Sequence, residues 1–542
     1  MAKIYFYAIL HRMTGMDKVK RPVRFFNTTG PCNPWDHYML PPEERLVDAQ
    51  LHRYIRDQLY WVLHAPRQTG KTTFLQNWMR EINSGRFNGG EAIACYVSVE
   101  RCQGVAEPEK AMPDICKAIQ EYAEAFGVPA PELKTCAANS MLSDVLGKWS
   151  ALVAPKPLVV LFDETDVLEG SALISFLRQL RGGFAARGPG TFPASIALVG
   201  MRDLKDYITA AKGGGNPNPG SPFNIKEDSA ALSDFQREDI AKLFAQRTEE
   251  TGQQINGDAL DYVYEQSRGQ PWIVNSLFKR AVMRILDEES RETVTIDHVM
   301  RAREQMIRAR ETHLDALAYR LEDPRIRKVM EALLTGEPDA GLAAGEAFRL
   351  CLDLGLVTII NGAPSVANPI YREVLAREMT YSTQLAIPQP EWEWEKAGGS
   401  LDMDTLLKKF QQFWRKHSEI WEEKSDYTEA FPHLLLMAFL QRILNGGGRI
   451  EREYAAGRGR VDLAVEYGKQ WFIIEIKLLH AYNTPDEVKE EGLRQINRYR
   501  NSIDAAAPAY LVIFDRRLKS KDIPWEERLS WRREGTVTVV GV

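Results

Sequence analysis

A loop that could bind phosphate lies at residues 65–73, where Gly70, Lys71 and Thr72 stand in succession. The apolar run YWVLH before it predicts a buried strand, and FLQNWMREI after it predicts an amphipathic helix. A loop between a strand and a helix surrounds a phosphate with backbone N–H groups, while its lysine reaches the outer phosphate oxygens. We therefore expect ATP to contact Ala65, Pro66, Arg67, Gln68, Thr69, Gly70, Lys71, Thr72 and Thr73. Ala65 stands where glycine is more usual, which the loop tolerates if the φ of Ala65 is negative.

Two acidic residues follow a second apolar run, LVVLF at residues 158–162. An unbroken run of this kind predicts a central parallel strand that is buried on both faces. Asp163 and Glu164 then lie at its carboxyl end, which is the edge where open α/β sheets bind ligands. We expect Thr72 and Asp163 to hold Mg²⁺ and Glu164 to polarise the attacking water. The alternative is an Asp-Glu pair that only caps the next helix.

A third apolar run, SIALV at residues 195–199, precedes Arg202. Arg202 is a candidate for sensing the γ-phosphate, although an arginine that pairs with a surface acid at the start of a helix explains it equally well. The glycine- and proline-rich stretch Gly213 to Pro222 predicts a flexible loop between this core and the next domain.

The order of these elements resembles AAA-type ATPases of the bacterial and archaeal group with a helical lid, over residues 24 to about 300. Arg268-Gly269-Gln270-Pro271-Trp272 resembles the G-x-P lid motif of that group. Pro271 fits the first turn of a helix, so the resemblance implies that this helix begins near the nucleotide. It also implies that the segment from Phe26 to Pro42 packs near the adenine.

The middle of the chain has the pattern of a winged helix. Residues 324–334 and 347–354 are predicted helices, and residues 356–367 are predicted to form a hairpin with Asn361-Gly362 at its turn. A winged helix could bind DNA, but a helix that reads DNA presents several basic or amide side chains. The second helix is mostly apolar and has Arg349 as its one arginine, so packing or protein contact is favoured over DNA reading.

A second constellation of chemically capable residues follows a linker at residues 386–400. Residues 457–465 and 471–477 predict two strands of a hairpin. Glu475 and Lys477 are two positions apart and therefore emerge on one face, and the turn brings Asp462 on the partner strand near them. Two carboxylates can hold Mg²⁺ and a lysine can orient water, which makes a minimal site for cleaving phosphodiesters.

This arrangement resembles the D…E-x-K signature of the PD-(D/E)XK nuclease superfamily. Gln495 and Tyr499 on the next predicted helix resemble the Q-x-x-x-Y motif of the RecB-like branch, and residues 511–515 supply the strand that follows it. The resemblance implies catalytic roles for Asp462, Glu475, Lys477, Gln495 and Tyr499, with metal held by Asp462 and Glu475. An additional helical acid is used by many members, and Glu429 and Glu453 are rival candidates.

The charged pair has an alternative explanation. Glu475 and Lys477 interrupt an otherwise apolar strand, where charge is costly unless it is used or paired. A structural Glu–Lys pair in a degenerate domain would satisfy this requirement without catalysis. Arginines that flank Asp462 and follow Glu475 suit a phosphate backbone, but a solvated helix face explains any single one equally well. They are Arg449, Arg452, Arg458, Arg460, Arg494, Arg498 and Arg500.

Composition limits the remaining possibilities. The chain has 542 residues and a net charge of −5, so any binding of nucleic acid must come from local basic patches. No apolar run is long enough to span a membrane, and no cleavable signal is evident, although the chain could start at Met16 rather than Met1. The six cysteines lack C-x-x-C spacing, so we expect a cytoplasmic protein without structural zinc.

The sequence thus predicts an α/β multidomain protein. Its expected parts are an N-terminal segment at 1–42, a P-loop AAA-type core at 43–215, a helical lid at 216–315, a winged-helix-like module at 316–385, the linker and an α/β PD-(D/E)XK nuclease-like domain at 401–542. We expect an ATPase coupled to a metal-dependent nuclease that acts on nucleic acid, with DNA favoured. The family pairing implies a context of defence or mobile elements, with a homo-oligomer as an option and no membrane partner. The alternative function is an ATP-driven signalling switch whose nuclease-like domain only binds nucleic acid or a protein.

Overall fold

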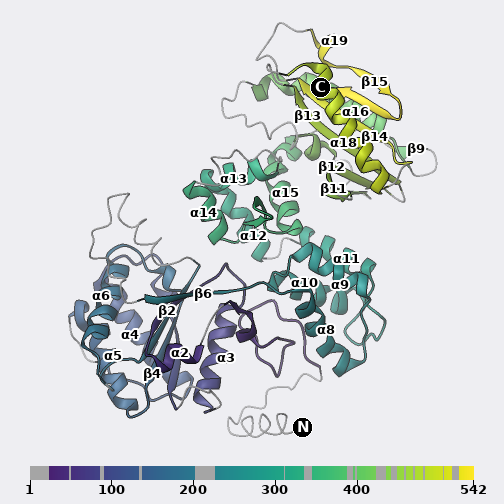
Figure 1. The fold of residues 1–542 in the computed structure, drawn as a ribbon. Helices are drawn as coiled ribbons and strands as arrows, with labels where there is room; N and C mark the ends of the chain where they lie inside the picture. Colours follow the sequence, from purple (N-terminus) through teal and green to yellow (C-terminus); the bar gives the residue numbers. More distant parts are fainter. Residues whose placement is uncertain are drawn as a thin grey trace. The chain divides into compact units, whose positions relative to one another are not determined.

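The computed structural model contains two compact units. Figure 1 shows the helices and strands of the chain, coloured along the sequence. The first comprises Met1–Ala309, Leu350–Thr358 and Ala367–Pro369, and the second comprises Arg310–Arg349, Ile359–Val366 and Ile370–Val542. The structure describes residues 23–47, 51–85, 91–133, 137–188, 190–201, 226–309, 312–334, 345–386, 395–396, 400–422, 435–440, 448–456, 459–467, 470–479, 483–503, 506–515 and 524–542.

The first unit contains a six-stranded sheet in the order β1-β6-β2-β5-β4-β3. Five of these strands are parallel, and the short β1 pairs antiparallel with β6. Their bounds are β1 (Leu46–Val47), β2 (Tyr60–His64), β3 (Ile93–Ser98), β4 (Leu158–Asp163), β5 (Ser195–Gly200) and β6 (Lys226–Leu232). The strands predicted from the three apolar runs are confirmed as β2, β4 and β5.

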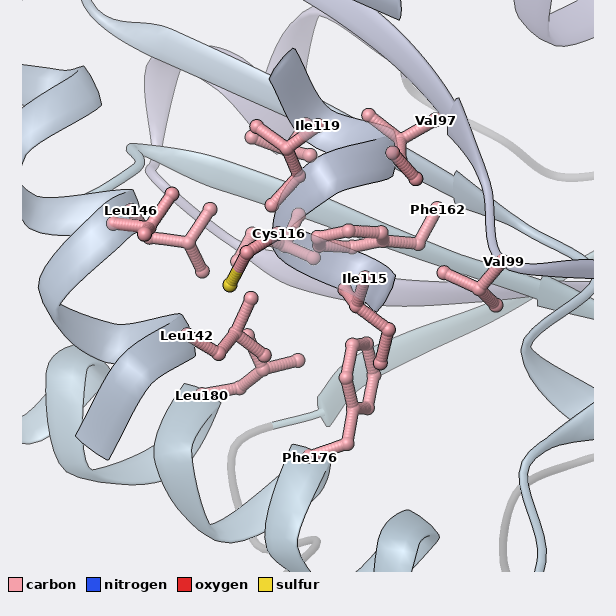
Figure 2. Packing of buried hydrophobic residues seen from close by; sticks show 14 of the residues in the cluster. Val97, Val99, Ile115, Cys116, Ile119, Leu142, Leu146, Phe162, Phe176 and Leu180 are labelled. Carbon is pink, nitrogen blue, oxygen red and sulfur yellow. The ribbon is translucent and has the colours of Figure 1, made fainter. Parts of the chain in front are cut away.

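Helices cover both faces of this sheet. They are α2 (Leu51–Arg56), α3 (Lys71–Asn83), α4 (Pro108–Ala125), α5 (Ala138–Val153) and α6 (Gly170–Ala186), with short helical turns η1 (Pro42–Arg45), η2 (Glu100–Cys102) and η3 (Thr165–Val167). Figure 2 shows one of the two cores, in which Ile115, Cys116, Leu142 and Phe176 from α4, α5 and α6 gather around Phe162 of β4. The second core joins α2 and α3 to the opposite face. The alternation of side chains along each strand supplies both cores, because successive residues point to opposite faces.

One predicted boundary is wrong. The core was expected to end at residue 215, but β6 begins at Lys226 and pairs in parallel with β2 inside the same sheet. The polar sequence KEDSAAL lacks the apolar pattern of a core strand. Pairing with the apolar β2 therefore overrides the weak local preference, as is common for strands.

The lid follows β6 and is entirely helical in its regular elements. It consists of α8 (Arg237–Thr251), α9 (Gly257–Ser267), α10 (Pro271–Arg280), the π-helical η4 (Ala281–Ile285) and α11 (Ile296–Arg308). The N-terminal segment packs on the lid, since the ring of Phe26 lies 5.9 Å from that of Phe244 and 5.0 Å from that of Phe278. Adenine contact by this segment stays a prediction.

The middle of the chain forms the helices and hairpin that the sequence predicts. The elements are α12 (Thr312–Tyr319), η5 (Arg320–Glu322), α13 (Pro324–Leu334), α14 (Glu346–Asp353), β7 (Val357–Ile360), β8 (Ala363–Val366) and α15 (Pro369–Ala386). Asn361 and Gly362 at the turn both have positive φ, at 51° and 81°, as a two-residue hairpin of this type requires. The two compact units divide this region between them, so its boundaries as a separate domain stay a prediction.

The C-terminal part contains a six-stranded sheet in the order β11-β12-β13-β14-β16-β15. The strands are β11 (Gly448–Ala456), β12 (Gly459–Tyr467), β13 (Gln470–Leu479), β14 (Ala509–Asp515), β15 (Trp531–Glu534) and β16 (Val537–Gly541). Its helices are α16 (Met403–Glu422), α18 (Pro485–Ile503), α19 (Trp525–Arg528) and a helical stretch at 435–440, while β9 (Glu395–Lys396) and β10 (Ser400–Leu401) form a small separate pair.

The face of β13 that carries Glu475 and Lys477 is separated from the larger core. Alternate residues Ile474, Ile476 and Leu478 pack with α16 and the 435–440 helix in the larger core, and Ile473 packs with Ile496 of α18. Glu475 and Lys477 have the parity of Ile473 and therefore lie on the α18 side. Within the described residues, no helix is both long and apolar enough to cross a membrane.

Candidate functional sites

The phosphate-binding loop is shaped by two residues with positive φ. Gln68 has a φ of 58°, and Gly70, which directly precedes α3, has a φ of 93°. The second value favours glycine, because an L side chain rarely adopts it. Ala65 is not among the residues with positive φ, so the condition for alanine at this position is met. The loop therefore enters α3 with the helix N-terminus at its base.

Lys71 is folded against its own loop. Its ammonium donates hydrogen bonds to the carbonyl oxygens of Ala65 at 2.8 Å and Pro66 at 2.9 Å. Burial lowers the pKa of Lys71, and the charges of Asp163 and Glu164 oppose this effect. The lysine is thus held within the loop by carbonyl groups that a phosphate could replace as acceptors.

The carboxylate of Asp163 connects the loop to two strands. Its Oδ2 accepts hydrogen bonds from the hydroxyl of Thr72 at 2.7 Å and from the phenol of Tyr96 on β3 at 3.1 Å. Its Oδ1 accepts one from the backbone N–H of Glu164 at 3.0 Å. Burial raises the pKa of Asp163, and the hydrogen bond from Thr72 and the charge of Lys71 act against that rise. The structure thus brings Thr72 and Asp163, the predicted metal ligands, into direct contact.

Glu164 has the properties of a general base. It has a φ of 58°, an uncommon backbone conformation for a residue other than glycine. Burial and the charges of Asp163 and Asp166 raise the pKa of Glu164 to about 7. A general base works best when its pKa lies near the working pH. The half-buried Glu164 is therefore matched to accepting a proton at neutral pH.

The lid reaches the loop through Gln270. Its side-chain Oε1 caps α10 by accepting from the N–H of Ile273 at 2.7 Å, and its Nε2 donates to the carbonyl of Gln68 at 3.4 Å. Gly269 before it has a φ of 84°, and a Cβ there would lie 1.9 Å from the carbonyl oxygen of Phe235. Only glycine fits this approach. The α10 N-terminus, with Pro271 in its first turn, thus lies beside the loop, while a contact between Pro271 and nucleotide stays a prediction.

Two residues near the loop were not predicted from the sequence. Arg45 is buried, and its guanidinium would lie 3.2 Å from a Cβ placed on Gly70. It donates to the carbonyl of Ser233 at 2.9 and 2.6 Å, and burial lowers its pKa to about 10. The second of these residues is Tyr96. Neither residue belongs to a sequence motif that would have identified it, because Arg45 follows two glutamates and Tyr96 lies within an apolar strand. Arg202 lies outside the described residues.

The second site forms where β12 and β13 pair. In the antiparallel register Leu463 lies opposite Ile474, which places Asp462 and Glu475 next to each other across the strands. The Oδ2 atom of Asp462 accepts from the backbone N–H of Ile476 at 2.7 Å. Only two residues of sequence separate β12 from β13, which limits the registers available to the pair. The predicted convergence of Asp462, Glu475 and Lys477 is present in the structure.

Glu475 is a buried carboxylate that is only half satisfied. The residue is 2% exposed, and its Oε2 has no hydrogen-bond partner among the residues that the structure describes, while its Oε1 lies 3.1 Å from the Nζ of Lys477. Burial and the neighbouring charge of Asp462 raise the pKa of Glu475 to about 8. Burial alone would lower the pKa of Lys477, but the charges of Glu475 and Asp462 outweigh it and raise that pKa.

Helix α18 adds a carboxylate beside this site. The side-chain Nε2 of Gln495 donates to the Oε1 of Glu491, one turn earlier, at 3.1 Å. The charge of Glu491 also raises the pKa of Lys477. Gln495 is thus linked to the site through Glu491, a residue that the sequence analysis missed, although its spacing of four from Gln495 on a helix could have indicated the pair.

The remaining predicted residues of this site are only partly described. Tyr499 lies on α18, and its side chain is outside the described residues, as are all atoms of Glu429. Glu453 lies on β11 between the positions that pair with Leu463 and Val461, in the same row as Asp462. The choice between Glu429 and Glu453 as an additional acid stays open.

Both centres fit a divalent cation in their donor sets. Thr72 and Asp163 supply a hydroxyl and a carboxylate, which are ligands that Mg²⁺ accepts. In the second centre, Asp462 and Glu475 would hold the ion, because the half-buried Asp462 and the buried Glu475 repel each other and the Oε2 of Glu475 has no hydrogen-bond partner among the described residues. When bound there, the cation would supply charge neutralisation and a more acidic water.

The C-terminal site lies in a segment with known relatives. Residues 427–514 match a family model described as the PD-(D/E)XK nuclease superfamily. The C-terminal unit contains a PD-(D/E)XK nuclease superfamily domain. This segment contains Asp462, Glu475 and Lys477, and their assignment as the D…E-x-K residues of the superfamily stays a prediction. Among curated proteins, none matches the sequence.

Several solved structures are similar to part of the chain. A Walker-type ATPase of Pyrococcus abyssi is 13% identical over 65% of this chain and 99% of its own, with a TM-score of 0.47. The ORC2 protein of Aeropyrum pernix is 14% identical over 61% of this chain and 93% of its own, with a TM-score of 0.39. The RuvB Holliday junction branch migration motor of Thermotoga maritima is 15% identical over 61% of this chain and 88% of its own, with a TM-score of 0.31.

Because these TM-scores are below 0.5, the assignment of the first unit depends on its own geometry. That geometry is a five-stranded parallel sheet, a lysine loop between β2 and α3, and a paired Asp-Glu at the end of β4. The first unit therefore has the fold of an AAA-like P-loop ATPase with a helical lid, joined in one chain to the PD-(D/E)XK domain.

Proposed function

We propose that this chain binds and hydrolyses ATP and uses the PD-(D/E)XK domain as a metal-dependent nuclease on nucleic acid, with DNA as the favoured substrate. The observation that carries the nuclease proposal is the convergence of Asp462 and Lys477 on the buried Glu475, one oxygen of which has no hydrogen-bond partner within the described part of the chain. A buried polar atom without a partner is rare in folded proteins, and it is explained if a cation completes the site.

The chemistry of the second site follows from its charges. Asp462 and Glu475 would hold Mg²⁺, and this ion would offset the burial that raises the pKa of Glu475. Lys477 remains positively charged between the two acids and lies next to the place where a phosphate and water would meet. Its ammonium would orient the water and neutralise the charge that develops on the phosphate.

The ATPase half of the proposal is supported by the loop and by Glu164. Lys71 and the α3 N-terminus would bind the phosphates, and Thr72 with Asp163 would hold Mg²⁺. Glu164 would accept the proton of the attacking water, for which a pKa of about 7 is suited. Arg202 stays a candidate for sensing the γ-phosphate, and a homo-oligomer and a role in defence or mobile elements stay predictions.

One observation favours the alternative function, a switch whose nuclease-like domain only binds. The 3.1 Å pair between Lys477 and Glu475 is what a structural pair in a degenerate domain would show. The two functions differ in whether the PD-(D/E)XK domain cleaves nucleic acid.

The deciding experiment incubates the full-length protein with labelled single-stranded and duplex DNA and RNA, with Mg²⁺ or with a chelator. Asp462→Asn serves as the matched variant, because it removes one charge and keeps the shape of the side chain. Cleavage that requires Mg²⁺ and is lost in Asp462→Asn supports the nuclease. Binding without cleavage by the wild-type protein supports the switch.

A further inference from the structure

We propose that Tyr96 is a positioning residue of the ATPase centre, which holds the Asp163 carboxylate so that one particular oxygen faces the cation. This inference rests on the proposed ATPase function. It concerns a residue of β3 that belongs to neither the phosphate-binding loop nor the acidic pair at the end of β4.

The count of hydrogen bonds on Asp163 distinguishes its two oxygens. A carboxylate oxygen can accept about two hydrogen bonds with its lone pairs. Oδ2 accepts from both Thr72 and Tyr96, whereas Oδ1 accepts only from the backbone of Glu164. Oδ2 is thus saturated by protein donors, and Oδ1 keeps capacity for a cation or its water. Tyr96 supplies the bond that creates this difference.

The position of Tyr96 is fixed on every side. In β3 it pairs with Leu161 of β4, and its backbone N–H donates to the Sδ of Met79 at 3.3 Å. Its ring packs edge-on against Tyr122 and Phe126, with centroids 5.4 and 6.1 Å apart. The residue is 5% exposed. A phenol fixed in this way fixes the acceptor to which it donates.

The edge of the sheet is also secured near this residue. β3 is the outermost strand beside β4, and its free side is covered by Asn83. The side chain of Asn83 accepts from the N–H of Ala94 at 2.8 Å and donates to its carbonyl at 2.9 Å. The strand that carries Tyr96 is therefore held by α3, the same helix that begins at Lys71 and Thr72.

A buried tyrosine hydroxyl always needs an acceptor, so a purely structural role for the bond must be distinguished from positioning. If the bond only satisfies Tyr96, its removal leaves the metal requirement unchanged. If it orients Asp163, its removal gives Oδ2 a free lone pair and lets the carboxylate turn. The cation then binds less well, while ATP without metal binds as before.

The test uses full-length wild-type protein, Tyr96→Phe and the control Tyr122→Phe. Phenylalanine keeps the ring and removes the donor. Tyr122 is the control because it packs on the Tyr96 ring, whereas Asp163 accepts from Thr72, Tyr96 and the backbone of Glu164. The readout is binding of a fluorescent, non-hydrolysable ATP analogue, first in chelator and then at increasing Mg²⁺. ATP turnover at limiting and saturating Mg²⁺ is the second readout, and the melting temperature monitors folding.

We expect equal analogue binding by all three proteins in chelator. With Mg²⁺, the midpoint of Tyr96→Phe should rise about tenfold, the size expected for loss of one hydrogen bond to a charged acceptor. Turnover of this variant should recover at saturating Mg²⁺, and Tyr122→Phe should match the wild type. In an Asp163→Ala background, Tyr96→Phe should have no further effect, because Tyr96 acts through Asp163.

An unchanged Mg²⁺ midpoint in Tyr96→Phe would overturn the inference. Loss of analogue binding already in chelator, or an effect of Tyr96→Phe that persists in the Asp163→Ala background, would show a structural role and overturn it as well. If the wild-type protein binds no analogue under any condition, the proposed ATPase function fails, which is a different result from a normal wild type with an unaffected variant.

Discussion

In the ATPase unit, the buried carboxylate of Asp163 accepts hydrogen bonds from Thr72, Tyr96 and the backbone of Glu164. In the PD-(D/E)XK domain, the equally buried Glu475 has one ion pair, with Lys477, and one oxygen without a partner. Both centres also contain a lysine, but Lys71 donates to loop carbonyls and Lys477 pairs with the carboxylate itself.

The two centres differ in how far hydrogen-bond donors of the protein surround the buried carboxylate. Burial raises the pKa of both carboxylates, but at Asp163 the hydrogen bonds from Thr72, Tyr96 and the backbone of Glu164 act against that rise and support the ionised form. Glu475 lies beside another carboxylate in an environment of low polarity, which favours its protonated form. We infer that the second centre depends on a cation for its charge balance, whereas the first needs the cation only for nucleotide chemistry.

The largest effects are expected from replacing the two lysines, which tests whether Lys71 serves only ATP turnover and Lys477 only nucleic-acid cleavage. Lys71→Ala should lower ATP turnover by on the order of a hundredfold or more, because a charge that binds phosphate is lost. Lys477→Ala should lower nucleic-acid cleavage to a similar extent and leave ATP turnover unchanged. Phosphate release and cleavage are measured on the same preparations. Wild-type phosphate release by Lys71→Ala would remove the ATP-site assignment.

Glu164→Gln should separate binding from hydrolysis in the first centre. The amide keeps the size of the side chain but cannot accept the proton of water, so turnover should fall by about a hundredfold while ATP binding is retained. Equilibrium binding and phosphate release are the two measurements. Simultaneous loss of both would mean that Glu164 shapes the site rather than acting as a base. Lys71→Ala, which should weaken binding, is the contrasting variant.

A smaller effect is expected if nucleotide state controls cleavage. Nuclease chemistry requires metal and water, so ATP can act only by shifting a conformational equilibrium. A change from about 10% to about 90% active conformation needs roughly 3 kcal/mol of differential binding and alters the rate about tenfold. Cleavage by the full-length protein is compared without nucleotide, with ADP, with ATP, and with ATP in Glu164→Gln. Equal rates in all four would indicate two independent enzymes on one chain.

The smallest expected effect concerns stability in the absence of metal. The folded-state pKa of Glu475, about 8, exceeds the ordinary glutamate value of 4.5, so the folded protein binds a proton that the unfolded chain has released between these pH values. The contribution of Glu475 to stability is therefore present below pH 4.5 and is lost as pH rises through 8. Glu475→Gln should flatten the pH dependence of the melting temperature across this window.

Thermal unfolding of the metal-free protein at several pH values provides the measurement. Added Mg²⁺ should raise the melting temperature of the wild type most at pH 8, and it should have less effect on Glu475→Gln. The matched comparison is Asp163→Asn, which without nucleotide should reduce the response to Mg²⁺ less than Glu475→Gln does, since protein donors already surround that carboxylate. An equal response at both centres would contradict the difference described above.

Much of both sites was determined by short stretches of sequence. The strand, loop and helix at residues 60–83 are contiguous, and only two residues of sequence separate the paired strands β12 and β13, which limits which residues can face each other. In both cases the chemistry-bearing residues are placed by local geometry. That is why the contact of Asp462 with β13 and the position of Lys71 could be predicted from residue order.

The tertiary structure decided the contacts between distant residues. Thr72 and Asp163 are 91 positions apart, and Tyr96 and Asp163 are 67 apart. The sequence of β3 does not indicate which strand Tyr96 will contact, because that contact depends on the order of the strands in the sheet. The inclusion of the polar β6 beside β2 was decided in the same way. Non-local pairing selects one partner among many with similar local propensities, and only the assembled sheet makes that selection.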